Sequence, residues 1–252
     1  MTGEPRRAAL VTGASYGIGH ATAVGLAQDG FDVAVTDLSS DTLARTVAAI
    51  EAAGRRAVAL ALDVRDQASV EAAVARAAAD LPGLDVLVNN AGVPSLGKPA
   101  IDVARGEWDT VIAVNLTGTF FMSTAFGRHL IAAGREGCVI SLASTHGTVG
   151  FAGTSAYGIA KAGISHMTRI LAIEWAPHGI RVNAIAPGST PTESRQRSLT
   201  DPVRRDTMLS RIPLRRFGTP EEMAGAIRYL ASPIASYITG QILLLDGGLT
   251  AY

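Results

Sequence analysis

The sequence contains a single cysteine, Cys138, among its 252 residues. One thiol excludes a disulfide framework within the chain, and it excludes a zinc site built on several thiolates. Cys138 lies in an apolar run at 137–140, so we expect a small buried core residue. The five histidines form no i, i+4 pair and no H-E-x-x-H motif. No metal site is therefore expected.

The chain has no net charge, few aromatic residues (5%) and no long apolar run. The 22 basic and 22 acidic residues cancel, so nucleic acid is not an expected partner. No stretch reaches about 18 consecutive apolar residues, and the polar residues 1–7 lack the apolar segment of a signal peptide. No membrane partner is expected, and we predict a soluble, cytoplasmic protein.

Short β-rich runs alternate with longer alanine-rich stretches, which is typical of parallel strands joined by crossover helices. The pattern predicts strands at 8–11, 32–36, 56–62, 86–89, 138–142, 181–186 and 241–245. It predicts helices at 17–29, 40–53, 67–80, 103–133 and 155–177, with another beginning after Thr219. We expect one α/β domain over residues 1–252, with a doubly wound, Rossmann-type, seven-stranded parallel sheet and helices on both faces.

The segment 188–216 interrupts this alternation with three prolines and a cluster of arginines, Arg195 among them. Insertions at the carboxyl ends of strands commonly shape a substrate pocket, so we expect a substrate lid here. The arginines suit a carboxylate, phosphate or sulfonate on the substrate, since guanidinium binds such groups bidentately. A solvated surface helix, balanced by neighbouring acids, is the alternative.

The first predicted strand runs into T-G-A-S-Y-G-I-G at 12–19 and then into a helix. Glycines at such a turn let backbone N–H groups approach a pyrophosphate, whose charge the helix N-terminus favours. Asp37 follows Gly19 by 18 residues, at the end of the second predicted strand, where an acid binds a ribose 2′-hydroxyl and repels a 2′-phosphate. No Lys or Arg occupies Ser15, Tyr16 or Leu38. The cofactor is therefore expected to be NAD.

Tyr157 and Lys161 are four residues apart at the start of a predicted helix. An i, i+4 pair shares one helix face, so the ammonium can stabilise the phenolate. This pair completes a set of segments that resembles the classical group of the short-chain dehydrogenase/reductase family. The set comprises T-G-x-x-x-G-I-G at 12–19, N-N-A-G at 89–92, Asn115, Ser144, Y-x-x-x-K at 157–161, and Pro187-Gly188 followed by Thr192.

The resemblance, which extends from residue 8 to 248, implies a role for each matching position. Tyr157 would exchange a proton with the substrate oxygen, Ser144 would hydrogen-bond that oxygen, and Lys161 would bind the nicotinamide ribose. Asn115 would hold a water in a proton relay through Lys161. The residues expected to bind the cofactor are Gly13, Ser15, Gly17, Ile18, Gly19, Asp37, Asp63, Val64, Asn90, Gly92, Tyr157, Lys161, Pro187, Gly188 and Thr192.

Substrate contacts are expected at Ser144, Tyr157, His146 and Arg195. His146, two residues after Ser144, suits a hydroxyl-rich or anionic substrate; a turn residue without contact is the alternative.

These residues predict an NAD-dependent oxidoreductase that moves a hydride between nicotinamide and a secondary alcohol or ketone, with a sugar, polyol or hydroxy acid as substrate. A 3-oxoacyl thioester reductase is the close alternative, which Asp37 disfavours because such reductases usually use NADPH. A non-catalytic NAD-sensing regulator is a third, although it has no need of the full catalytic set. The long apolar faces of 103–133 and 155–177 exceed what one sheet covers, so we expect them to pack against another subunit. The resemblance implies a homotetramer, because many members of that family are tetramers.

Overall fold

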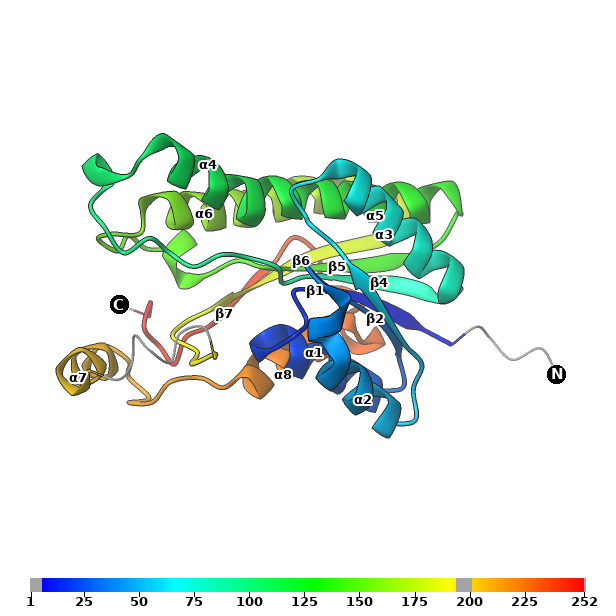
Figure 1. Ribbon diagram of the computed structural model, residues 1–252, viewed down its shortest axis with the longest axis horizontal. Coiled ribbons are helices and arrows are strands. Elements are labelled where there is room, and N and C mark those ends of the chain that lie inside the picture. The colour runs from blue at the N-terminus through cyan, green and yellow to red at the C-terminus, as the bar shows by residue number, and fades with distance from the viewer. Residues whose placement is uncertain (1–5, 194–200, 252) are drawn as a thin grey trace.

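Seven parallel strands form one sheet in the order β3-β2-β1-β4-β5-β6-β7 (Figure 1). The computed structural model describes residues 6–193 and 201–251. The strands are β1 Ala8–Thr12, β2 Asp32–Asp37, β3 Ala57–Ala61, β4 Leu84–Asn89, β5 Gly137–Leu142, β6 Ile180–Pro187 and β7 Ile242–Leu245. The seven predicted strands are confirmed, with ends that shift by one or two residues, as strand ends commonly do.

Helices cover both faces of this sheet (Figure 1). One face carries α1 (Gly17–Gln28), α2 (Ala44–Ala52) and α8 (Pro220–Ala231). The other carries α3 (Gln67–Asp80), α4 (Arg105–Ile112), α5 (Thr119–Ala132) and α6 (Ser155–Trp175). Short 3-10 helices are η1 (Ser40–Leu43), η2 (Ala100–Asp102), η4 (Thr145–Gly147), η5 (Ala176–His178) and η7 (Pro233–Ala235). A helix that was not predicted separately, α7 (Pro202–Ser210), lies away from both layers.

Alternation along each strand divides the core into two apolar layers. In β1, Leu10 packs toward α3, α5 and α6, whereas Val11 packs toward α1 and α8. Successive strand residues point to opposite faces, so a strand covered on both sides must be apolar at every position. This is why the strands read as continuous apolar runs in the sequence.

The helix predicted at 103–133 contains a change of helix type. The helical stretch is confirmed from 105 to 132, but a π-helical turn, η3 (Ala113–Gly118), separates α4 from α5. By length and composition alone, Arg105–Ala132 is apolar enough to cross a membrane. A share of 44% of its most apolar window is buried inside the protein, and the core helix of a soluble protein passes the same test.

Candidate active site

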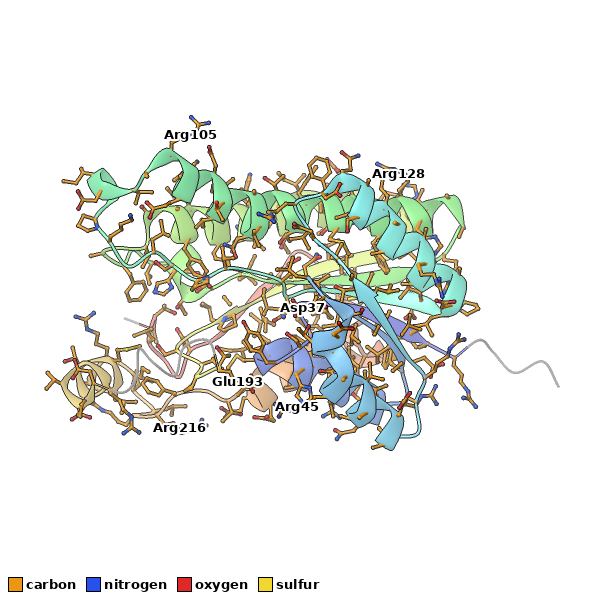
Figure 2. All side chains as sticks on the ribbon, viewed as in Figure 1. Asp37, Arg45, Arg105, Arg128, Glu193 and Arg216 are labelled. Carbon is orange, nitrogen blue, oxygen red and sulfur yellow. The ribbon has the colours of Figure 1, made fainter. Side chains whose placement is uncertain are left out.

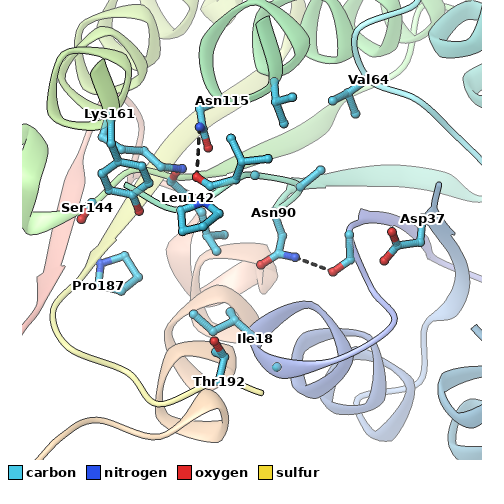
Figure 3. Close-up of a pocket in the computed structure, with 18 of the residues that line it drawn as sticks. Ile18, Asp37, Val64, Asn90, Asn115, Leu142, Ser144, Lys161, Pro187 and Thr192 are labelled. Carbon is cyan, nitrogen blue, oxygen red and sulfur yellow. Dashed lines mark hydrogen bonds between the residues drawn. The ribbon is translucent and has the colours of Figure 1, made fainter. Parts of the chain in front are cut away.

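A cavity of about 400 Å³ opens at the carboxyl ends of the strands (Figure 3). The strand order reverses between β1 and β4, which is where open α/β sheets bind ligands. Most residues singled out in the sequence line this cavity: Gly13, Gly17, Ile18, Asp37, Asp63, Val64, Asn90, Gly92, Asn115, Ser144, Tyr157, Lys161, Pro187, Gly188 and Thr192. Ser15, Gly19 and His146 are not part of the lining, and Arg195 lies outside the described residues.

The glycine-rich turn between β1 and α1 forms one wall of the cavity. Gly13 and Gly17 have left-handed backbones, with φ of +63° and +59°, which glycine adopts without steric cost. A Cβ on Gly17 would lie 3.0 Å from Cγ2 of Thr192, so the turn also packs tightly against the chain that follows β6. Tyr16 precedes α1 and offers no side-chain cap to its first N–H groups. The positive end of the helix is therefore available to an anion such as a pyrophosphate.

Asp37 stands at the end of β2 with its carboxylate already oriented. Its Oδ2 accepts hydrogen bonds from Oγ of Ser15 at 2.5 Å and from the Ser15 backbone N–H at 3.3 Å. Its Oδ1 accepts the backbone N–H of Leu38 at 2.9 Å. Ser15 thus contacts the acid rather than the cavity directly. A carboxylate fixed on the wall (Figure 3) can accept hydrogen bonds from the hydroxyls of a ribose, and it repels a phosphate.

Asn90 fastens the glycine-rich turn to the strand beside it. Its Nδ2 donates to the carbonyl oxygen of Thr12 at 2.9 Å. It also donates to the carbonyl oxygen of Gly13 at 2.7 Å, and Figure 3 draws this second bond. The backbone N–H groups of Asn90 and Ala91 both donate to Oγ1 of Thr12 at 3.0 Å. These bonds hold Asn90 in place on the cavity wall.

The end of the cavity beyond β3 carries an ion pair that the sequence interpretation missed. Nη2 of Arg65 lies 2.6 Å from Oδ2 of Asp63, and the Arg65 backbone N–H donates to Oδ1 at 3.0 Å. The side-chain hydrogen bond from Arg65 is the main cause that lowers the pKa of the Asp63 carboxyl below its usual value. Asp63 is therefore ionised at neutral pH, and the charge of Arg65 is compensated by it.

Asn115 lies in the π-helical turn η3, fully buried beside the cavity. Its Nδ2 donates to the carbonyl oxygens of Val93 and Val111, at 3.2 and 3.1 Å. Within the described part of the chain, its Oδ1 has no hydrogen-bond partner. A Cβ on Gly92 would approach this oxygen to 2.6 Å, so the neighbouring glycine keeps the oxygen accessible. A buried acceptor in this position can hold a water molecule or a ligand hydroxyl.

Tyr157 and Lys161 lie one turn apart near the start of α6, as their spacing predicts. Lys161 is only 5% exposed. Its Nζ donates to the carbonyl oxygen of Leu142 at 2.6 Å and lies 5.6 Å from the centre of the Tyr157 ring. An ammonium this close in a buried site attracts negative charge on the phenol oxygen more strongly than it would in water.

Ser144 caps the 3-10 helix η4 and lines the same end of the cavity (Figure 3). Its Oγ accepts the backbone N–H of His146 at 3.2 Å. Because the oxygen is the acceptor in that bond, the hydroxyl proton can be donated into the cavity. Ser144, which follows β5, is thus brought together with Tyr157 and Lys161 of α6, whereas the His146 ring packs edge-on against the Tyr157 ring.

The chain that follows β6 forms another wall of the cavity, and an ion pair with α2 holds this segment in place. Pro187, Gly188 and Thr192 line the cavity from this segment. Glu193 then pairs with Arg45 of α2, with 3.1 Å between Nη1 and Oε1 (Figure 2).

Val93 and Pro94 also line the cavity. The lining further includes residues that the sequence interpretation missed: Tyr16, Thr36, Leu38, Leu62, Arg65, Ala91, Thr110, Val114, Leu142, Ala143 and Thr190. Most of them stand next to a predicted site residue, at the carboxyl end of a predicted strand, and that position was an available signal. Thr110 comes from α4 and has no such signal.

The residues present fit a dinucleotide. The cavity is lined by the acid Asp37, by the N-terminus of α1, and by Ser144 and Tyr157 together with the buried cation Lys161. No group of three or more His, Cys, Asp or Glu side chains gathers to hold a metal ion in the described ranges 6–193 and 201–251.

Comparison with known proteins identifies the family. A family model described as enoyl-(acyl carrier protein) reductase, adh_short_C2, matches residues 13–250. The chain belongs to the classical short-chain dehydrogenase/reductase family. A cis-4-hydroxycyclohexanecarboxylate dehydrogenase from Sinomonas cyclohexanicum is 43% identical over 247 residues, which are 97% of each chain. A 2-dehydro-3-deoxy-D-gluconate 5-dehydrogenase from Escherichia coli (strain K12) is 38% identical over 245 residues, 97% of this chain and 96% of that one.

Solved structures of short-chain dehydrogenases/reductases share the fold. A variant of actinorhodin polyketide ketoreductase with NADPH has a TM-score of 0.92 at 33% identity, and the match covers 100% of both chains. The family resemblance and the fold class that the sequence predicted are confirmed. This short-chain dehydrogenase/reductase is an oxidoreductase that acts on CH–OH groups and uses a nicotinamide cofactor.

Proposed function

We propose that this enzyme is an NAD-dependent dehydrogenase of a small secondary alcohol, either a sugar, a polyol or a hydroxy acid. The observation that carries the proposal is a single cavity that joins the Asp37 carboxylate to Ser144, Tyr157 and Lys161. The two dehydrogenases named above support the substrate class, because their names give a hydroxy acid and a sugar acid.

In the proposed hydride transfer, each residue at the end of the cavity that holds Ser144, Tyr157 and Lys161 has one task. When bound, the nicotinamide ring supplies the hydride acceptor or donor. The Ser144 hydroxyl donates a hydrogen bond to the substrate oxygen and stabilises the negative charge that develops on it. The Tyr157 oxygen takes the proton from the alcohol, or returns it to the ketone. Lys161 stabilises the phenolate, and Oδ1 of Asn115 holds a water that links Lys161 to solvent.

The preference for NAD over NADP follows from the negative charge of Asp37 at its end of the cavity. Asp37 is an acid held in place by Ser15, and its neighbours Tyr16 and Leu38 on the cavity wall are uncharged. Arg65 also lines this end, but it is paired with Asp63. A 2′-phosphate would therefore meet a fixed negative charge with no free cation beside it in the described part of the wall.

A 3-oxoacyl thioester reductase is the second candidate. The NADPH-bound polyketide ketoreductase favours it, because its name gives the reduction of a ketone. Asp37 argues against it, because such reductases usually use NADPH. An NAD-sensing regulator has less support, since it needs no complete set of Asn115, Ser144, Tyr157 and Lys161.

We also propose that the segment 188–216 acts as the substrate lid of a domain that spans residues 1–252. The enzyme is a homotetramer, because α5 and α6 expose Phe120, Phe121, Ile170 and Ile173, which are 41%, 37%, 43% and 77% accessible. It works in the cytoplasm, where its free, buried Cys138 stays reduced. Light scattering tests the assembly, and cell fractionation tests the location.

A substrate screen tests the proposal. The purified enzyme is incubated with sugars, polyols, hydroxy acids including cis-4-hydroxycyclohexanecarboxylate, and 3-oxoacyl thioesters, each with the NAD and the NADP couple. Turnover of an alcohol with NAD is the expected result. Preferential reduction of a 3-oxoacyl thioester with NADPH supports the second candidate instead, and tight NAD binding without any turnover supports the regulator.

A further inference from the structure

His146 touches both groups that face the substrate oxygen, although it does not line the cavity. Its backbone N–H donates to Oγ of Ser144 at 3.2 Å. Its imidazole meets the ring of Tyr157 edge-on, with the ring centres 5.7 Å apart and the planes at 79°. One residue therefore contacts the hydrogen-bond donor and the proton-transfer group together.

The imidazole is supported from its other side by Phe151. The two ring centres lie 4.5 Å apart, and their planes meet at 87°. Oγ1 of Thr154 donates to the carbonyl oxygen of Phe151 at 2.7 Å, directly before α6 begins. Phe151 is thus tied to the start of the helix that carries Tyr157, so the three rings form a row of edge-on contacts with little freedom to move.

The backbone of His146 is fixed on the same helix. A Cβ on Gly158 would lie 2.9 Å from the carbonyl oxygen of His146, so this carbonyl packs directly on the first turn of α6. A shift of His146 would therefore change the position of Ser144 relative to Tyr157.

We propose that His146 is a positioning residue for Ser144 and Tyr157, and that the reaction depends on its ring as a packing surface rather than as a polar contact to the substrate. This inference rests on the proposed function. It distinguishes two properties of histidine, because phenylalanine has a ring of similar shape without the nitrogens, whereas leucine has neither ring nor nitrogens.

The test compares His146→Phe with His146→Leu. The substrate is cis-4-hydroxycyclohexanecarboxylate, or the compound from the screen with the highest kcat/KM. His146→Leu is expected to lower kcat about 2- to 13-fold, the effect of one edge-on aromatic contact. KM for the alcohol and Kd for NAD should stay within about twofold, and His146→Phe should restore kcat to within about twofold of wild type. Phe151→Leu should lower kcat in the same direction, and its effect should not add fully to that of His146→Leu.

Two kinetic results overturn the inference. One is a rise in the alcohol KM in both His146 variants with kcat unchanged, which would make the imidazole a substrate ligand. The other is wild-type kcat in His146→Leu. Thermal unfolding and NAD titration of every variant show whether the fold and the cofactor site are intact.

A second readout needs no substrate. Carbon-13 at Cζ of the five tyrosines gives a small set of NMR signals, and Tyr157→Phe identifies the one from Tyr157. His146→Leu is expected to move that signal because the adjoining ring is lost, and an unmoved signal overturns the inference. Failure of the proposed function is a separate result: Tyr157→Phe would then keep full turnover, or no compound of the screen would react.

Discussion

Replacing Asp37 by asparagine should reverse the cofactor preference of this enzyme. The substitution removes one negative charge and keeps the size of the side chain. Asp37 is half-buried on the cavity wall, where Ser15 and Leu38 hold its carboxylate by three hydrogen bonds. Two unit charges about 4 Å apart interact by about 1 kcal/mol in water and by about 4 kcal/mol near a protein surface. Relief of about 2 kcal/mol would raise kcat/KM for NADP about 30-fold.

The same substitution should weaken use of NAD. Hydrogen bonds to a charged acceptor contribute about 1.5–3 kcal/mol, so kcat/KM for NAD should fall at least about 10-fold when the ribose hydroxyls lose the carboxylate. The ratio of the two kcat/KM values should therefore change by about 300-fold or more in favour of NADP.

Steady-state kinetics with both cofactors at constant ionic strength measure this ratio. Asp41→Asn is the matched control, because it removes the same charge from an exposed position on η1 that does not line the cavity. The control should leave the ratio within about twofold. An unchanged ratio in Asp37→Asn, or an equal change in Asp41→Asn, would refute the reasoning.

Three more substitutions or treatments have defined outcomes. Gly147→Ala should lower kcat about 100-fold and leave Kd for NAD nearly unchanged, because a Cβ there would lie 2.6 Å from the carbonyl carbon of Lys161 and would push η4 away from α6. Kinetics and NAD titration check this, and wild-type kcat would contradict it. Glu193→Gln should speed NADH release up to about fivefold, since it breaks an exposed ion pair with Arg45 worth about 0.2–1 kcal/mol. Stopped-flow displacement measures the release rate. An unchanged rate would show that this ion pair does not hold the segment after β6 over the cofactor. Burial raises the pKa of Cys138 from 9.0 to about 11, so a thiol reagent at pH 9 should label only the unfolded protein, and the free energy of unfolding should decrease as the pH rises from about 9 to 11. Rapid labelling of the folded enzyme would contradict that expectation.

The sheet could be predicted from the sequence because a parallel strand covered on both faces leaves a simple pattern. β1 and β4 are apolar at nearly every position and end at polar residues, Thr12 and Asn89. The site residues at the ends of these strands followed directly, since parallel strands bring their carboxyl ends to one edge. The i, i+4 spacing of Tyr157 and Lys161 needed only the helix that carries them.

What the sequence did not reveal depends on contacts between distant segments. The hydrogen-bond register of a helix is not encoded in its apolar periodicity, so the π-helical turn at Asn115 could not be predicted. The bond between Ser15 and Asp37 spans 22 residues, and the ring contact of His146 with Tyr157 requires the folded turn η4. Ser15 and His146 were expected to touch ligands, and the structure turns both toward residues expected to act on those ligands.

Comparison of Tyr157→Phe with wild type is the most direct test of the proposed chemistry. Both proteins are assayed with NAD and the preferred alcohol from the screen, and NAD binding is titrated in parallel. Phenylalanine keeps the ring against His146 and removes only the oxygen that exchanges the proton. The account predicts an unchanged Kd for NAD and a loss of kcat of at least about 100-fold, which general acid–base catalysis typically contributes. Turnover near the wild-type rate would contradict it.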